Sequence, residues 1–156
     1  MKKIGRISLY IILGSFIFIQ FFRVELNTSA EVPEHDLLLV HPDMETDLQQ
    51  TFRTSCYDCH SDNTDYPWYA HIAPFSWVID QHIRNGKHEV NYNGYDTLGK
   101  RKKIALLDEI CEVVSDSSMP PANYLMLHPE AVLSEEDIAA ICEWTEMEAL
   151  KLLRRK

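Results

Sequence analysis

The residues best suited to chemistry form the short sequence Cys56-Tyr57-Asp58-Cys59-His60. Two cysteines separated by two residues and followed directly by a histidine are the attachment signature of c-type haem. Each thiol can add across one haem vinyl group, and a one-turn step between the cysteines matches the separation of the two vinyls. The histidine then lies beneath the iron, where an imidazole nitrogen can bind it as the proximal ligand. We therefore predict one covalent haem c on Cys56 and Cys59, with His60 as an iron ligand.

Other functions of a Cys-x-x-Cys pair fit this chain less well. A thioredoxin-like redox pair is expected within a βαβ unit, and no such pattern surrounds the motif. A zinc site would need a second closely spaced pair of ligands, whereas Cys111 and Cys142 stand far apart without neighbouring histidines. If the chain is exported, these two spare cysteines could form a disulfide, and two buried free thiols are the alternative.

The sixth position of the iron distinguishes between possible functions. Met119 is our first candidate because it precedes Pro120 and Pro121 in a loop before the last predicted helix, and a thioether ligand stabilises ferrous iron. Met126, on the same loop, is a lesser candidate. His82 is the alternative nitrogen ligand, since it lies on the apolar face of a predicted helix, where an imidazole needs a polar partner. Met119 could instead simply pack in the interior.

The N-terminal end of the chain predicts a membrane-targeting segment. Three basic residues precede an uncharged, mostly apolar run from Ile7 to Phe22. This run is long for a removable signal, its one cleavage candidate (28–30) is poor, and a full membrane span needs about 20 residues. We expect an uncleaved anchor in the cytoplasmic membrane that places the domain on the periplasmic, extracytoplasmic side. The predicted organisation is an anchor at 1–23, a linker at 24–42 and a haem-binding domain at 43–156.

Hydrophobic periodicity predicts an all-α domain without strands. Met44, Leu48 and Phe52 recur at four-residue spacing and give the first helix one buried stripe, which leads the chain to the two haem cysteines. Gly86 is placed to end the second helix, and Ser134 begins a pattern typical of a capping box. The predicted helices occupy about 43–54, 74–86, 98–114 and 135–153.

Two further sets of side chains are expected in the interior. Phe75, Val78, Ile79 and His82 share one face of the second predicted helix. Large aromatic rings are expected to form a dry wall around the haem or to pack in the core, because such a wall lowers the local dielectric constant. These aromatic residues are Trp68, Tyr69, Trp77 and Trp144.

The chain is acidic, with 15 lysines and arginines against 24 aspartates and glutamates and a formal net charge of -9. Binding to nucleic acid requires a basic surface, so we do not expect a nucleic-acid partner. An acidic surface would suit a basic redox partner protein, although it also serves solubility.

Several separate blocks, in a defined order, carry a resemblance to a known family. They are Cys56-Tyr57-Asp58-Cys59-His60-Ser61, Tyr66-Pro67-Trp68-Tyr69, Pro74-Phe75-Ser76-Trp77, His82-Ile83 with Gly86, Met119-Pro120-Pro121, and His128-Pro129-Glu130-Ala131 with Leu133-Ser134. Together they resemble the bacterial haem-binding domain family, which is c-type cytochrome-like. The resemblance implies covalent haem on Cys56 and Cys59 with His60 as iron ligand, and a Met-Pro loop and closing helix like those of class I cytochromes c. The sequence departs from the family at residues 91–95, where an Asn-Phe-Ser-x-Trp-like block is expected.

These observations favour a membrane-tethered, monohaem electron carrier and not an enzyme, working with redox partner proteins that the sequence does not identify. The pair His60 and Met119 stands without an obvious proton-transfer group. The alternative is a haem enzyme of peroxide chemistry, or a gas or redox sensor, with an open sixth iron position. A third possibility is a role in haem capture or assembly. Fold alone does not decide among them.

Overall fold

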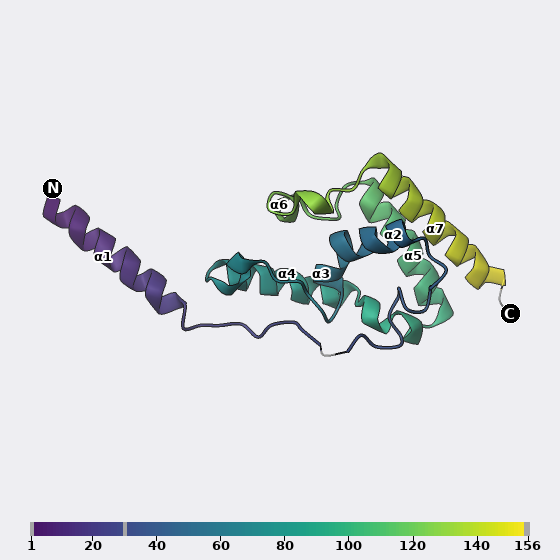
Figure 1. Ribbon diagram of the computed structural model, residues 1–156, viewed down its shortest axis with the longest axis horizontal. Coiled ribbons are helices and arrows are strands. Elements are labelled where there is room, and N and C mark those ends of the chain that lie inside the picture. The colour runs from purple at the N-terminus through teal and green to yellow at the C-terminus, as the bar shows by residue number, and fades with distance from the viewer. Residues whose placement is uncertain (1, 30, 155–156) are drawn as a thin grey trace.

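The computed structural model describes residues 2–29 and 31–154 (Figure 1). Within these two stretches the chain is helical, and extended backbone pairs only in an isolated antiparallel bridge between Thr28 and Asn63. The α-helices are α1 (Lys2–Ile19), α2 (Thr46–Phe52), α3 (Asp58–His60), α4 (Phe75–Glu89), α5 (Lys100–Ser115), α6 (Ala122–Leu125) and α7 (Glu135–Arg154). A π-helical turn, η1 (Arg53–Tyr57), and three 3₁₀ turns, η2 (Trp68–His71), η3 (Tyr92–Thr97) and η4 (Pro129–Ala131), connect them.

The core lies where α2, α5 and α7 meet. Helices α5 and α7 run side by side, and α2 lies beside them (Figure 1). Leu107 of α5, Ile141 of α7 and Phe52 of α2 are fully buried in one hydrophobic cluster. The Phe52 ring meets the Trp144 ring edge-on, with 5.6 Å between their centroids. Met44, Leu48 and Phe52 are all buried, as predicted, but Met44 precedes α2, which begins three residues after the predicted start at residue 43. The predicted interior position of Trp144 is confirmed.

The last helix begins at the predicted residue. Ser134 Oγ accepts a hydrogen bond from the Asp137 backbone N–H at 3.1 Å, and Asp137 Oδ2 accepts one from the Ser134 backbone N–H at 2.9 Å. This reciprocal pair is a capping box, which satisfies backbone donors that the first helical turn leaves free. The capping pattern in the sequence therefore identified the start of α7 correctly.

The predicted membrane helix is wrong. Among the residues that the structure describes, no helix is long and apolar enough to cross a membrane. Helix α1 ends at Ile19, three residues before the apolar run of the sequence does, and its first turns hold the basic residues. Its uncharged part, residues 7–19, is about 20 Å long, whereas the hydrocarbon core of a bilayer is about 30 Å thick. The prediction of an N-terminal anchor in the cytoplasmic membrane, with the domain on the periplasmic side, therefore has no support.

The chain that follows α1 is bound to the rest of the protein instead. The Gln20 side chain donates to the Ala73 carbonyl at 3.0 Å and accepts from the Ala73 N–H at the same distance. The Trp77 indole N–H donates to the Phe22 carbonyl at 2.8 Å. Further along, Leu37 is fully buried in the core.

Helix α4 differs from its prediction in length and in orientation. Gly86 does not end the helix, which continues to Glu89. A Cβ atom at Gly86 would lie 2.7 Å from the carbonyl oxygen of Cys59, so the glycine allows α4 and α3 to approach closely. Ser76 and Ile83 are the buried residues of α4, whereas on the predicted face Phe75 and Val78 are exposed and Ile79 and His82 are only partly buried.

The aromatic residues were predicted with mixed success. Trp68 and Trp77 are exposed and do not line the interior, whereas Trp144 does. The buried rings that the sequence analysis missed are tyrosines: Tyr57, Tyr92 and Tyr95. Two of these, Tyr92 and Tyr95, lie in residues 91–95, the block that departs from the family pattern.

Candidate functional site

A cavity lies among the Cys-x-x-Cys-His segment, α5 and the loop that follows α5. Cys56, Cys59, His60 and Met119 all line it. The space between the lining side chains is partly open to solvent. The lining is otherwise mainly apolar, with Val90, Leu106, Ile110, Val113, Val114, Pro120 and Pro121. Two sulfur atoms and an imidazole in an apolar cavity suit a haem.

The helical segment that ends in α3 positions the three motif residues. Cys56 lies in η1, while Cys59 and His60 lie in α3, so the chain turns continuously from the buried stripe of α2 into the motif. A π-helical turn holds more residues than an α-helical turn, and such turns occur frequently at functional sites. Here η1 shifts the side chains after Phe52 out of register with the α2 stripe. The motif can therefore line the cavity while Phe52 remains in the core.

His60 is held in the orientation that a metal ligand needs. Its Nδ1 lies 3.1 Å from the Val90 carbonyl oxygen, to which it donates when the proton is on Nδ1. This bond leaves the lone pair of Nε2 available to a metal, as in other ligating histidines. The Tyr92 ring lies beside the imidazole, with 5.5 Å between centroids. Burial lowers the pKa of His60, and the neutral imidazole that results is the ligating form.

The two motif thiols are poorly suited to disulfide exchange. Burial raises the pKa of Cys56 to about 12, and it raises the pKa of Cys59 to about 11. Exchange requires the thiolate, and reactive Cys-x-x-Cys pairs have lowered pKa values. This contrast argues against the thioredoxin-like alternative. Both cysteines are free thiols.

The structure separates the candidates for the second iron ligand. Met119 lines the cavity, is about two-fifths exposed, and donates its backbone N–H to the Val113 carbonyl at 3.0 Å. Met126 is 82% exposed on the surface of the same loop. Of the residues described, neither Met126 nor His82 lines the cavity. Met119 is therefore the candidate that tertiary structure brings together with His60.

Several polar residues around the cavity were not predicted. The Tyr124 hydroxyl donates to Asp58 Oδ2 at 2.9 Å, and both residues line the cavity. Burial raises the pKa of the Asp58 carboxyl and that of the Tyr124 hydroxyl. Away from the cavity, the Tyr57 hydroxyl donates to Asp36, a carboxylate that is almost fully buried. Contacts between distant residues of this kind leave no periodic signal in the sequence.

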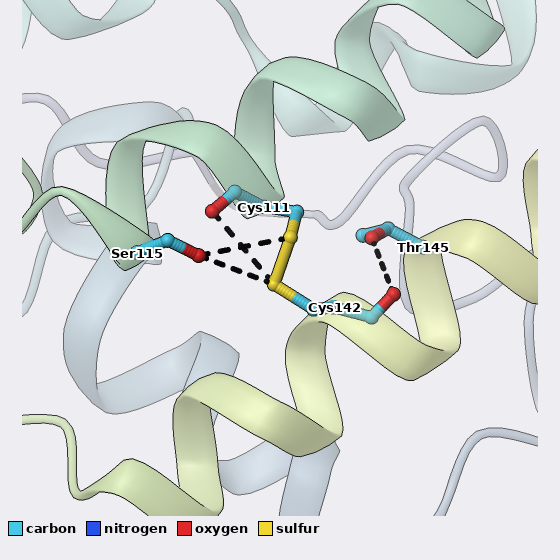
Figure 2. Close-up of a disulfide and its surroundings, with 4 residues drawn as sticks. All are labelled: Cys111, Ser115, Cys142 and Thr145. Carbon is cyan, nitrogen blue, oxygen red and sulfur yellow. Dashed lines mark hydrogen bonds between the residues drawn. A yellow bond between two sulfur atoms is a disulfide. The ribbon is translucent and has the colours of Figure 1, made fainter.

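The other two cysteines form a disulfide, which resolves the alternative left open by the sequence. Cys111 of α5 and Cys142 of α7 are joined by an S–S bond of 1.98 Å, with 4.8 Å between their Cα atoms (Figure 2). The Ser115 hydroxyl lies 3.5 Å from the Cys142 sulfur. Cys111 stands next to Ile110 in the sequence, and Ile110 lines the cavity. The bond therefore joins the cavity wall to the closing helix.

Comparison with known proteins adds one finding. Residues 14–147 match the family model of the haem-binding domain. No curated protein and no solved structure matches the chain.

Proposed function

Because the chain belongs to the haem-binding domain family, we propose that it holds one covalent haem c in the cavity described above and acts as a one-electron carrier. The match to the family supports haem binding. Covalent attachment, the ligand pair and electron transfer are our proposals. The observation that carries them is the presence of Cys56, Cys59, His60 and Met119 around a single apolar cavity.

In this proposal each motif residue has a separate task. The thiols of Cys56 and Cys59 would hold the haem through two thioether links, and His60 Nε2 would bind the iron while the Val90 carbonyl holds Nδ1. The bound haem supplies an iron that can exist in ferric and ferrous states. The protein then needs to move no proton, and no substrate is transformed.

Met119 completes the proposed site. A thioether in the sixth position stabilises ferrous iron and raises the reduction potential. The apolar part of the cavity lining acts in the same direction, because a surrounding of low dielectric constant disfavours the more highly charged ferric state. Both effects suit a carrier that accepts an electron and passes it on without binding a substrate at the iron.

The partners in this proposal are redox proteins. The net charge of -9 favours partners with a basic surface, since complementary charges speed the encounter of two proteins. This attraction is screened by salt, so exchange of electrons with a basic partner should slow as ionic strength rises.

The test is the optical spectrum of the reduced, haem-loaded protein before and after carbon monoxide is added. We expect wild type to be unaffected and Met119→Ala to bind carbon monoxide readily, because removal of the thioether opens the sixth position. Met126→Ala is the matched control: it removes a methionine from the same loop, but one that lies on the surface. This control should behave like wild type.

A different result would favour the second function. If wild type binds carbon monoxide as readily as Met119→Ala, the sixth position is open or weakly held, and the enzyme or sensor alternative becomes preferred. A redox titration without a reversible one-electron couple would rule out the carrier.

A further inference from the structure

The loop that carries Met119 has little packing of its own to hold it over the cavity. It comprises residues 116–134, between α5 and α7. Within this described stretch only Pro120 and Ala131 are buried, and Met126 and Leu127 are well exposed. Hydrophobic burial thus anchors the loop near its start, at Pro120, and near its end, at Ala131 and the partly buried Leu133. Something else must determine the position of the residues between them.

Hydrogen bonds supply the missing restraint, and they connect the loop to the haem-attachment segment. The Tyr124 hydroxyl donates to Asp58 Oδ2 at 2.9 Å. The Ser55 hydroxyl donates to the Ala131 carbonyl at 3.1 Å. Asp58 lies between the two attachment cysteines and Ser55 directly precedes the first. The cavity wall that bears His60 is therefore tied directly to the loop that bears Met119.

Both partners of the first bond are themselves held in place. Asp58 Oδ1 accepts from the Asp65 backbone N–H at 3.0 Å, which fixes the orientation of the carboxylate. The Tyr124 ring stacks on the His128 ring, with 4.1 Å between centroids and 10° between planes. His128 Nε2 is in turn hydrogen-bonded to the Tyr69 hydroxyl at 2.7 Å. The donor and the acceptor are thus both held in place, so their hydrogen bond can fix the position of the loop relative to the haem-attachment segment.

We propose that Asp58 and Tyr124 form a latch that holds the Met119 loop against the attachment segment and so keeps the Met119 sulfur within reach of the iron. This inference rests on the proposed function, since it assumes that Met119 binds the iron. Tyr124 and Asp58 are positioning residues in this arrangement. Neither supplies an atom to the iron, and both act through the place they give to Met119.

The first test measures the rate at which carbon monoxide binds to the reduced, haem-loaded protein. Tyr124→Phe removes the hydroxyl but keeps the ring that stacks on His128. We expect it to accelerate binding about tenfold, because loss of a hydrogen bond to a charged acceptor frees the loop more often. Tyr66→Phe is the matched control. It removes a hydroxyl that accepts at 2.8 Å from the N–H of Asn27, a residue outside the loop, so it should leave the rate unchanged.

The second test separates the latch from the iron. Amide hydrogen exchange is followed over residues 122–131 of the haem-loaded Met119→Ala protein, with and without Tyr124→Phe. Because no methionine ligand remains at residue 119, faster exchange on loss of the hydroxyl reports the latch alone. We expect exchange to be about tenfold faster with Tyr124→Phe and unaltered with Tyr66→Phe.

The outcomes distinguish the two proposals. Equal exchange with and without the Tyr124 hydroxyl overturns the latch, as does an unchanged carbon monoxide rate in Tyr124→Phe when wild type resists the gas. If wild type itself binds carbon monoxide freely, Met119 ligation fails, and the position that the latch was proposed to secure fails with it. Faster exchange in Tyr124→Phe would then show only that the bond restrains the loop.

Discussion

The two pairs of cysteines in this protein differ in bonding and in surroundings. Cys56 and Cys59 are three positions apart, line a cavity and are free thiols. Cys111 and Cys142 are separated by 31 positions and are bonded to each other. The first pair is positioned by a single helical segment and lines the cavity. The second pair is brought together by the packing of α5 on α7, which places the two sulfur atoms against each other.

The comparison teaches that the surroundings decide what a cysteine does. Burial raises the pKa values of Cys56 and Cys59, so both remain protonated at neutral pH and do not react readily with other thiols. Both thiols are thus available for the haem that we propose. The bonded pair instead closes a loop across the domain and contributes to stability. The following predictions test this division, from the largest expected effect to the smallest.

Replacing the attachment pair should have the largest effect. In the double variant Cys56→Ala, Cys59→Ala we expect complete loss of haem that survives denaturation, because no thioether can form. The measurement is the mass of the denatured chain. The double variant Cys111→Ala, Cys142→Ala serves as control and should retain the mass of one haem. Haem that stays on the chain without Cys56 and Cys59 would contradict the division.

Removing the bonded pair should reduce stability without removing haem. Since the disulfide spans 31 positions, its loss should lower the free energy of unfolding by about 3–4 kcal/mol, on the loop-entropy estimate. Urea unfolding of Cys111→Ala, Cys142→Ala measures this change. Wild type treated with a thiol reductant should lose the same amount. A loss of less than about 1 kcal/mol in both would show that helix packing alone holds α5 and α7 together.

A smaller loss of stability is expected when the packing of α4 against α3, which carries Cys59, is disturbed. Gly86→Ala places a methyl group 2.7 Å from the Cys59 carbonyl oxygen, so α4 must move away. We expect a loss of about 1–3 kcal/mol in the free energy of unfolding, which is typical of overpacking. Gly94→Ala is the control, because its methyl group would lie 3.7 Å from the nearest atom, the Thr97 hydroxyl oxygen. Equal stability of the two variants would show that the α3–α4 contact yields easily.

The sequence predicted local features well and their mutual arrangement poorly. The stripe of Met44, Leu48 and Phe52 and the cap at Ser134 were correct because each depends on residues within one or two turns. The face of α4 was predicted only in part, because apolar spacing defines a stripe but not the neighbour it meets: Phe75 and Val78 are exposed, and Ser76 and Ile83 are the buried residues.

The N-terminal segment shows the same limit. Composition identified an apolar run, but where the helix ends depends on its contacts. Gln20 hydrogen-bonds to the Ala73 backbone just beyond the end of α1. A helix that stops there is too short to cross a membrane, so the prediction of an anchor was wrong although the hydrophobic residues on which it rested are present.

By itself, the sequence brought Cys56, Cys59 and His60 together and predicted a haem site there, since all three residues lie within five consecutive positions. Only the tertiary structure brought Met119 to the same cavity, joined Cys111 to Cys142 and set Tyr124 against Asp58. The reason is physical. A contact between residues far apart in the chain depends on how helices pack, and packing is decided by the shapes of many side chains together and not by the spacing of a few.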